Sequence, residues 1–287
     1  MHLGDELPPG LVELADEVGR LLHAATPTGR LGVAFSGGVD SGLLLALAVR
    51  YLGPARVLAV IGVSPSLAAD ELRAARAVAA AIGAPVVEVA THEGDNPLYR
   101  ANGPDRCFHC KDELFTRISD EVAAAHGLGA VAYGENADDA RRPDRPGARA
   151  AANHAVLRPL ADAGLAKADV RALARALGLP NADKPAAPCL ASRIPHFSRV
   201  EPAKLRQIEA LERVVHGLGF PDCRVRHHGE IARIELPEDD IARAMQPGSR
   251  VALQQAGIAA GFRFVAVDVA GIQSGAFTLP LVEAGHA

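Results

Sequence analysis

Apolar runs and amphipathic stretches alternate over the first two-thirds of the chain. Four short and mostly apolar runs predict buried strands, at Leu31–Phe35, Arg56–Val63, Pro85–Ala90 and Ala130–Tyr133. Stretches with apolar residues three or four positions apart predict helices, at Leu11–Ala25, Gly42–Tyr51, Ala68–Ile82, Lys111–His126 and Lys167–Leu177. Strands that alternate with helices in this way predict a doubly wound α/β domain with a parallel sheet. Ligands are then expected beyond the carboxyl ends of the strands.

A second pattern begins near Val200 and predicts a smaller α/β domain. It contains predicted helices at Pro202–Leu218, Asp239–Met245 and Arg250–Ala260, a strand pair at Arg224–His228 and Ile231–Leu236, and a strand at Arg263–Val269. We therefore expect two domains, residues 1–198 and 199–287. In the first of them, Asn136–Arg149 is rich in Asp, Arg, Pro and Gly, which predicts a long polar loop.

Composition and charge narrow the class of protein. Hydrophobic residues make up 49% of the 287 residues, which indicates a globular chain. No apolar run reaches the roughly 20 residues that span a bilayer, and the acidic start is not typical of a secretory signal. We expect a cytoplasmic protein without a membrane partner. The net charge of −4 argues against a nucleic-acid partner such as tRNA, because such binding depends on Lys and Arg.

The strand predicted at Leu31–Phe35 runs directly into a glycine-rich turn and a helix. Adjacent glycines let the backbone approach an anion closely, and the following helix directs unpaired N–H groups toward it. The turn lacks the Gly-Lys-Ser/Thr ending of a Walker loop and resembles instead the PP-loop of the ATP pyrophosphatases. The alternative is an ordinary strand–helix turn with a serine cap. The resemblance implies that ATP is bound by six residues, Ser36, Gly37, Gly38, Val39, Asp40 and Ser41.

Four cysteines are the next candidates for chemistry, namely Cys107, Cys110, Cys189 and Cys223. In a reducing compartment, cysteines are more often catalytic or metal-binding than disulfide-bonded. Cys107 and Cys110 form a C-x-x-C just before a predicted helix, a spacing that suits zinc, an iron–sulfur cluster or a redox pair. Two incidental cysteines are the alternative. Cys223 is better interpreted as a bystander packed beside a strand than as a fourth ligand.

Cys189 lies in a polar segment bounded by prolines, with cations on both sides. Lys184 and Arg193 favour its thiolate, which is the form that attacks electrophiles and binds metals. The alternative is a buried packing cysteine. Farther along, Arg224 and Arg226 alternate on one predicted strand and so share a face. Guanidinium groups suit phosphate recognition, and solvent-facing arginines on an edge strand are the alternative.

Seven blocks between about residues 30 and 240 resemble the LarE family, the sulfur transferases used in making the nickel-pincer nucleotide cofactor of lactate racemase. The PP-loop block is shared by a superfamily, whereas the Cys189 block and the R-V-R-H-H-G block are far more particular. The blocks are F-S-G-G-V-D-S (35–41), N-G-P-D-R-C-F-H-C-K (102–111), N-A-D-D (136–139), R-P-G-A-R-A-A (145–151), R-P-L (158–160), D-K-P-A-A-P-C-L-A-S-R-I-P (183–195) and R-V-R-H-H-G-E-I-A-R-I-E (224–235).

The resemblance implies a two-step reaction. A carboxylate of a pyridinium mononucleotide attacks the α-phosphate of ATP, with Mg2+ on the phosphates, and a sulfur nucleophile then displaces AMP. The sulfur comes either from a [4Fe–4S] cluster held by Cys107, Cys110 and Cys189, or sacrificially from Cys189, which ends as dehydroalanine. Three protein ligands leave one iron open, which a sulfide carrier needs, and this favours the cluster form.

The resemblance also assigns roles to single residues and suggests partners. A homo-hexamer is expected from the family, and a protein that donates sulfide is a possible partner. By the same resemblance, Asp40 orients the loop or contacts the metal-bound phosphates, Arg193 lies near the nucleophile, Arg224 and Arg226 hold the substrate phosphate, and Glu235 binds a metal or positions the substrate. A salt bridge is an equally good interpretation of Glu235.

Three rival functions remain open. A tRNA thiolase also combines a PP-loop with three cysteines, but it would bind tRNA tightly and in a salt-sensitive way. An ammonia-using synthetase of the GMP or NAD type would keep its activity without Cys189. A non-catalytic nucleotide-binding module, like the electron-transfer flavoproteins, would release no pyrophosphate from ATP.

Overall fold

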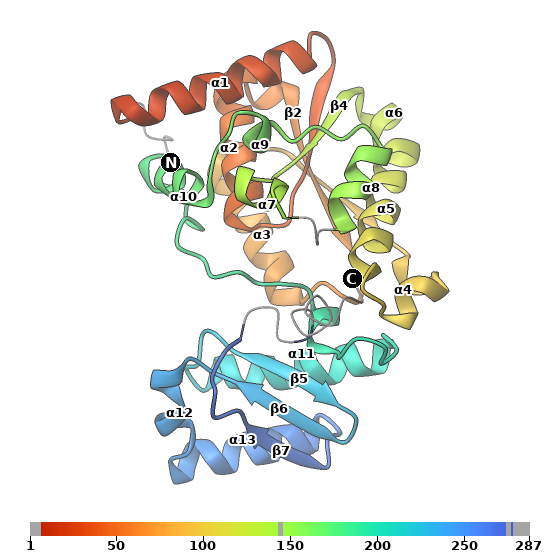
Figure 1. Cartoon of the computed structure of the whole chain (residues 1–287), viewed down its shortest axis with the longest axis vertical. Helices are drawn as coiled ribbons and strands as arrows, with labels where there is room; N and C mark the ends of the chain where they lie inside the picture. Colours follow the sequence, from red (N-terminus) through yellow and green to blue (C-terminus); the bar gives the residue numbers. More distant parts are fainter. Residues whose placement is uncertain (1–6, 143–145, 274–276, 278–287) are drawn as a thin grey trace. The chain divides into compact units, whose positions relative to one another are not determined.

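A computed structural model describes residues 7–142, 146–273 and 277, and its chain packs into two units (Figure 1). Unit 1 comprises the chain up to Ser64, Ala69–Glu93 and Cys107–Ala187, and unit 2 comprises Pro65–Ala68, Gly94–Arg106 and the chain from Pro188 onward. The domain boundary expected between residues 198 and 199 stays a prediction.

Unit 1 is built on a four-stranded parallel sheet with the strand order β3-β2-β1-β4. Its strands are β1 (Arg30–Ala34), β2 (Val57–Val63), β3 (Val86–Ala90) and β4 (Leu128–Tyr133). Parallel neighbours require crossovers, and helices supply them. The doubly wound α/β fold predicted from the sequence is confirmed.

One face of the sheet carries α2 (Val39–Leu52), whose residues are mostly buried. Around it pack α1 (Pro9–Ala25), α3 (Ala69–Ile82) and α10 (Lys167–Ala176), as Figure 1 shows.

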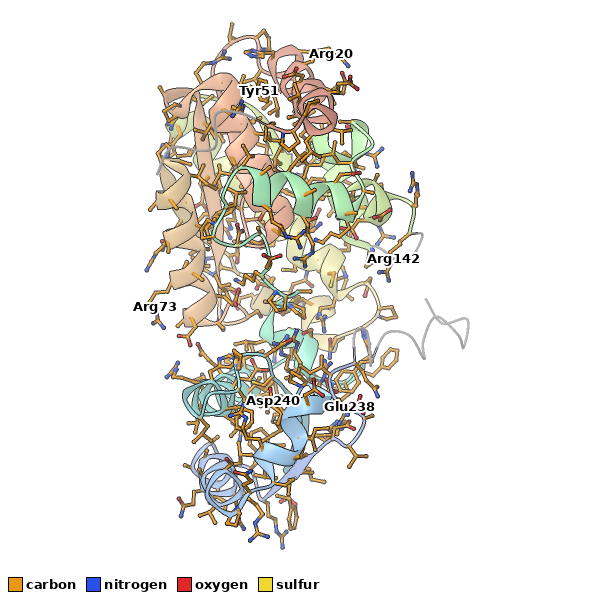
Figure 2. All side chains as sticks on the ribbon, turned by 90° about the vertical axis from the view of Figure 1, so that its left-hand side faces the viewer. Arg20, Tyr51, Arg73, Arg142, Glu238 and Asp240 are labelled. Atoms are coloured by element: carbon orange, nitrogen blue, oxygen red, sulfur yellow. The ribbon has the colours of Figure 1, made fainter. Side chains whose placement is uncertain are left out.

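The ring of Tyr51 in α2 occupies the space beside Gly19 of α1, where an added Cβ would lie 2.5 Å from the ring. Its hydroxyl donates to Asp16 at 2.6 Å. Burial, followed by the bond to Asp16, raises the pKa of Tyr51 to about 12, so the hydroxyl stays a donor. Figure 2 labels Tyr51 beside α1. The ring contact with Gly19 and the hydrogen bond to Asp16 hold α1 against α2.

The other face of the sheet is covered by α5 (Arg106–Arg117), a π-helical turn (Ile118–Val122), α6 (Ala123–His126) and α8 (Pro146–Asn153). Phe115, Ile118 and Val122 pack there against the strands. The helix predicted at Lys111–His126 therefore begins five residues early, and the C-x-x-C lies within its first turns. The long polar loop predicted at Asn136–Arg149 is also wrong, because α7 (Ala137–Ala140) and the start of α8 occupy much of it; residues 143–145 lie outside the described residues.

Unit 2 contains a three-stranded sheet in the order β5-β6-β7, with β5 (Arg224–His228) antiparallel to β6 (Ile231–Glu235) and β7 (Phe264–Val267) parallel to β6. The predicted strand pair is thereby confirmed. Helices α11 (Pro202–Gly217) and α13 (Pro247–Ala259) pack on each other and on this sheet. The short α12 (Glu238–Ala244) begins with acidic residues, two of them labelled in Figure 2, which suits the positive end of a helix.

Short elements complete the described chain. They are the helices α4 (Pro97–Ala101) and α9 (Pro159–Asp162) and 3-10 turns at Pro54–Arg56, Glu93–Asp95 and Leu190–Arg193. Of the helices described, none is both long enough and apolar enough to cross a membrane.

Candidate active site

The PP-loop, residues Ser36–Ser41, connects the carboxyl end of β1 to α2 in unit 1. Gly37 has a φ of +75°, and an added Cβ would lie 2.8 Å from the Cβ of Ala75 and 2.9 Å from its Cα. Only glycine therefore fits this corner. The helix begins at Val39, directly after the turn, so its first N–H groups face the end where an anion would bind.

Two serine hydroxyls brace the loop from the inside. The Oγ atoms of Ser36 and Ser41 lie 3.1 Å apart, and Ser36 N donates to Ser41 Oγ at 3.3 Å. Ser41 Oγ in turn donates to the carbonyl of Gly38 at 3.2 Å. The six residues singled out in the sequence thus form the turn Ser36–Gly38 and the start of α2, joined by these serine bonds.

The carboxylate of Asp40 is held on both of its oxygens. Asn136 Nδ2 donates to Oδ1 at 2.9 Å, and Lys167 Nζ donates to Oδ2 at 2.5 Å. Asn136 follows β4, and the same strand end brings Gly134 so close that an added Cβ would lie 2.5 Å from Ser41 N. This geometry suits an Asp40 that orients the loop.

Sequence reasoning assigned no role to Lys167 or Asn136. A signal was present for Lys167, which stands in the first turn of α10, where the helix dipole disfavours a cation. Such a lysine needs a carboxylate partner, and Asp40 is that partner. For Asn136 the signal was its place just beyond the carboxyl end of a parallel strand.

Cys107 and Cys110 lie three residues apart in the first turns of α5, and so on one side of that helix. The Cys107 side chain is exposed and that of Cys110 is partly exposed. Between them, Phe108 packs under the guanidinium of Arg149, with 4.3 Å from the guanidinium carbon to the ring centre. Both thiols are therefore accessible and stand on a braced helix.

In unit 2, Cys189 is exposed and immediately precedes the 3-10 turn Leu190–Arg193. Its carbonyl accepts from Ser192 N at 2.9 Å and from Ser192 Oγ at 2.7 Å. Arg193, which is buried, donates to the carbonyl of Pro188 at 2.6 Å and pairs with the buried Glu212 at 2.9 Å. The backbone that presents the Cys189 thiol is therefore fixed on both sides.

Arg226 and Glu235 form a buried ion pair across β5 and β6, with 2.8 Å between their nearest atoms. Arg226 is 5% exposed, so the solvent-facing alternative for this residue is wrong. It also donates at 3.0 Å to the carbonyl of Ser192, in the 3-10 turn that follows Cys189 (the Cys189 turn). Its Nε is buried and has no hydrogen-bond partner among the residues that the structure describes. Arg224 is only partly buried and pairs with Asp222.

Glu235 is fully buried, and Arg233 lies 3.2 Å from its second oxygen. Glu235 therefore forms its ion pairs with two arginines. Such pairing is typical of a carboxylate that stabilises the structure or positions other groups. Within residues 7–142, 146–273 and 277, no three His, Cys, Asp or Glu side chains gather into a group that could hold a metal ion.

Cys223 differs from the other three cysteines because it is buried. Burial, reinforced by the nearby carboxylate of Glu212, raises the pKa of its thiol far above the usual range. We expect Cys223 to resist a thiol reagent at about pH 8 in the native protein, where Cys107 and Cys189 react readily, and to react only after unfolding. Peptide mapping after brief labelling checks this, and prompt native labelling of Cys223 would contradict it.

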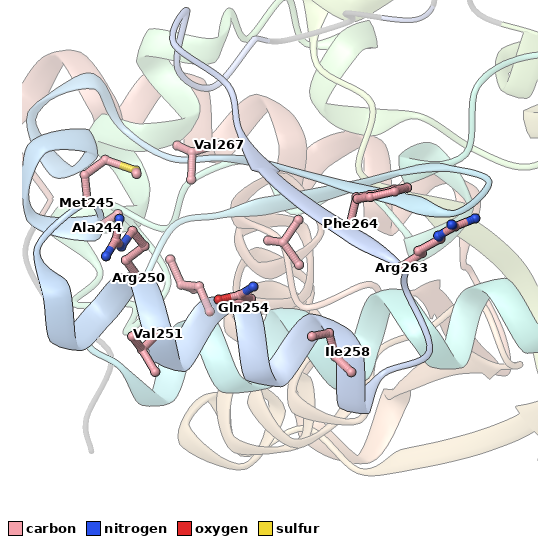
Figure 3. Close-up of a pocket in the computed structure, with 11 residues that line it drawn as sticks. Ala244, Met245, Arg250, Val251, Gln254, Ile258, Arg263, Phe264 and Val267 are labelled. Carbon is pink, nitrogen blue, oxygen red and sulfur yellow. The ribbon is translucent and has the colours of Figure 1, made fainter.

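A groove of about 500 Å³ lies in unit 2 between α13 and β7 (Figure 3). Its ionisable lining residues are Arg250 and Arg263, and the rest is mainly apolar, including Met245, Ile258 and Phe264. Among the described residues of the lining there is no nucleophile and no acid, the groups that a catalytic site requires.

Comparison with known proteins gives three matches of interest. A family model described as asparagine synthase matches residues 13–101, which include the PP-loop. An uncharacterized protein of Synechocystis sp. is 41% identical over 243 residues, covering 85% of this chain and 90% of that protein. The pyridinium-3,5-bisthiocarboxylic acid mononucleotide synthase of Lactiplantibacillus plantarum is 35% identical over 274 residues, covering 96% of this chain and 98% of the synthase.

The similarity to the synthase extends over nearly the whole of both chains, so it includes the PP-loop of unit 1 and the Cys189 turn of unit 2. The resemblance drawn from the sequence blocks agrees with it. This chain belongs to the LarE-type family of pyridinium-3,5-bisthiocarboxylic acid mononucleotide synthases.

Proposed function

We propose that this chain is an ATP-dependent sulfur transferase that converts a carboxylate of a pyridinium biscarboxylate mononucleotide into a thiocarboxylate. The observation that carries the proposal is the 35% identity, over 274 residues, to a synthase named for the bisthiocarboxylic product. The braced PP-loop and the exposed Cys189 support it, because they supply an activating group and a sulfur-bearing group in one chain.

The first step activates the carboxylate, which is a poor electrophile on its own. A carboxylate oxygen attacks the α-phosphorus of ATP, the bond from that phosphorus to the bridging oxygen breaks, and pyrophosphate leaves. The PP-loop N–H groups and the start of α2 would bind the phosphates together with Mg2+. The contacts of Asp40 with Asn136 and Lys167 favour a loop-orienting role for this carboxylate.

The second step delivers sulfur to the acyl-adenylate. In the sacrificial version the Cys189 thiolate attacks the carbonyl carbon and AMP leaves, which gives a thioester. Loss of the Cys189 Cα proton then breaks the Cβ–S bond, leaving a thiocarboxylate and a dehydroalanine. The fixed backbone at Ser192 and Arg193 supports a rigidly presented thiol.

In the cluster version, Cys107, Cys110 and Cys189 would hold a [4Fe–4S] cluster, which supplies sulfide when bound. Their exposed or partly exposed thiols fit ligands of such a group, and the buried Cys223 does not. A cluster version needs a source of sulfide, for which we propose a donor protein. A homo-hexamer, the assembly of the family, is part of the same proposal.

The substrate phosphate is assigned to Arg224 and Arg226. In support, Arg226 lies beside the Cys189 turn, and within the described part of the chain its Nε has no hydrogen-bond partner. Glu235 is proposed to position Arg226 through their ion pair, which is a better use of a carboxylate buried among arginines than metal binding.

The test is direct turnover. The protein is incubated with ATP, Mg2+ and pyridinium-3,5-biscarboxylic acid mononucleotide, with pyrophosphate measured enzymatically and the product by mass. We expect pyrophosphate only when the mononucleotide is present, and a product in which sulfur has replaced an oxygen. Pyrophosphate release that depends instead on tRNA or ammonia would overturn the proposal.

A further inference from the structure

A short segment after α10 is tied to its surroundings at several points. We call this segment, Asn181–Lys184, the strap. Arg171 of α10 donates to the carbonyls of Ala182 at 2.8 Å and Lys184 at 3.2 Å. Lys184 Nζ pairs with Glu71 of α3 at 2.6 Å. The strap is therefore fixed to two helices of unit 1.

The first residue of the strap reaches the PP-loop. Asn181 is 3% exposed, and its Nδ2 donates to the carbonyls of Gly37 and Gly38, at 3.1 Å each. The same amide lies so close to Gly42 that an added Cβ there would be 2.5 Å from Nδ2. With the amide turned over, its oxygen would face two carbonyl oxygens, so the hydrogen bonds define its orientation.

The bond to the Gly37 carbonyl bears on which way the first peptide of the loop faces. The Gly38 carbonyl also accepts from Gly42 N at 2.8 Å and from Ser41 Oγ at 3.2 Å, so it does not depend on Asn181 alone. In a trans peptide the C=O and the following N–H point in opposite directions. Holding the Gly37 carbonyl against Asn181 therefore turns the N–H group of Gly38 to the opposite side. Without the bond from Asn181, the Gly37 carbonyl would be able to rotate toward the bound anion and repel it. We propose that Asn181 is a positioning residue that keeps the PP-loop in its anion-binding orientation.

The carbonyl oxygen of the Asn181 side chain supports a role as hydrogen-bond donor rather than simple packing. Asn181 Oδ1 is buried and has no hydrogen-bond partner in the described structure. Burying an unpaired acceptor is unfavourable, and an apolar side chain of similar size would avoid that penalty. What the asparagine provides that such a side chain lacks is the pair of donors to Gly37 and Gly38.

The proposal rests on the proposed function only in taking ATP as the ligand of the loop. We would therefore compare Asn181→Asp, which replaces the donor by an acceptor, with Asn181→Ala and with the exposed control Asn153→Asp on α8. Binding of ATP to the full chain is measured by calorimetry below each variant's unfolding midpoint. We expect Asn181→Asp to weaken ATP binding by about tenfold or more, Asn181→Ala to weaken it less, and the control to change nothing.

The pH dependence of ATP affinity distinguishes a hydrogen-bonding role of Asn181 from a packing role, because a packing role would give no such dependence. Between about pH 8 and pH 6, the introduced carboxyl of Asn181→Asp gains a proton and can donate to one carbonyl. Its ATP affinity should then recover relative to wild type, while Asn181→Ala shows no recovery. If Asn181→Asp does not fold, Asn181→Ser takes its place in the binding comparison.

Hydrogen exchange separates this inference from the proposed function. In the ligand-free protein we expect the Gly38 amide to exchange faster in Asn181→Ala than in wild type. Unchanged exchange there, or wild-type ATP affinity in folded Asn181 variants, would overturn the positioning role. Failure of the wild-type protein to bind ATP, with altered exchange in the variant, would count against the proposed function alone.

Discussion

Replacing Cys189 by alanine is expected to leave pyrophosphate release intact and to abolish thiocarboxylate formation. Activation is assigned to the PP-loop in unit 1, whereas Cys189 is an exposed thiol in unit 2, directly before the 3-10 turn Leu190–Arg193. The acyl-adenylate should then form and decay by hydrolysis, so ATP is consumed without sulfur transfer. Measuring pyrophosphate and product mass on one sample checks both the activation step and the sulfur-transfer step.

The matched control is Cys223→Ala, which removes a thiol that is buried, whereas the Cys189 thiol is exposed. It should keep full sulfur transfer at the cost of some stability, because truncating a buried side chain leaves a small cavity. Sulfur transfer that survives in Cys189→Ala would contradict the assignment of the sulfur-bearing group. Retained activity of that variant with ammonia, and no sulfur in the product, would favour an ammonia-type synthetase.

Variants of the C-x-x-C distinguish the two sources of sulfur. If a cluster delivers the sulfide, Cys107→Ala and Cys110→Ala should lose iron and repeated turnover after anaerobic purification. If Cys189 is sacrificed, both variants should still complete one turnover, and the wild-type chain should lose the mass of H2S. Iron analysis and intact mass after one turnover distinguish the two versions. The cluster version predicts bound iron and an unchanged chain mass, and the sacrificial version predicts a chain that has lost the mass of H2S.

Replacing Gly37 by alanine is expected to abolish ATP binding and to lower stability. At a φ of +75°, a Cβ costs about 1–2 kcal/mol in backbone strain. It would also lie 2.9 Å from the Cα of Ala75, a backbone atom of α3 that cannot turn aside. Such overpacking adds about 1–3 kcal/mol, and relief of the contact must shift the loop. Calorimetric titration with ATP and thermal unfolding check the two effects.

Gly53→Ala is the matched control for this variant. Gly53 has a φ of +82°, but no atom lies within 4 Å of an added Cβ. The control should therefore show the strain cost alone and bind ATP normally. Equal stability and equal ATP affinity in the two variants would show that the contact with Ala75 has no effect on the loop.

The sequence was most informative where signals are local. The strand at Leu31–Phe35 and the glycine-rich turn after it are defined by neighbouring residues, and β1 and the PP-loop lie where the pattern predicted them. The start of α5 was misplaced for the opposite reason. Its first turns contain Cys107, His109 and Cys110, whose polarity looks like that of a turn, and burial of Phe115 against the sheet comes from distant strands.

Side chains that brace the PP-loop from far along the chain could not be found by local pattern. Lys167 stands 127 residues from Asp40, and Asn181 stands 144 residues from Gly37. A polar residue with a distant partner has the same local pattern as one that faces water. Only the unfavourable place of Lys167 at a helix start indicated a hidden partner. The burial of Arg226 and Glu235 was missed for the same reason, since it depends on pairing across β5 and β6.

The burial of α2 also has a consequence for the order of events during synthesis. This helix is covered by α1, α3 and α10, and β1 is paired on one side with the late strand β4. A nascent chain that ends near Ala101 therefore exposes one edge of β1 and the α10-facing side of α2. Contacts over such separations form slowly, and exposed apolar surface of this kind promotes aggregation. Although the PP-loop is encoded within the first 41 residues, its hydrogen bond with Asn181 forms only after residue 181 has left the ribosome.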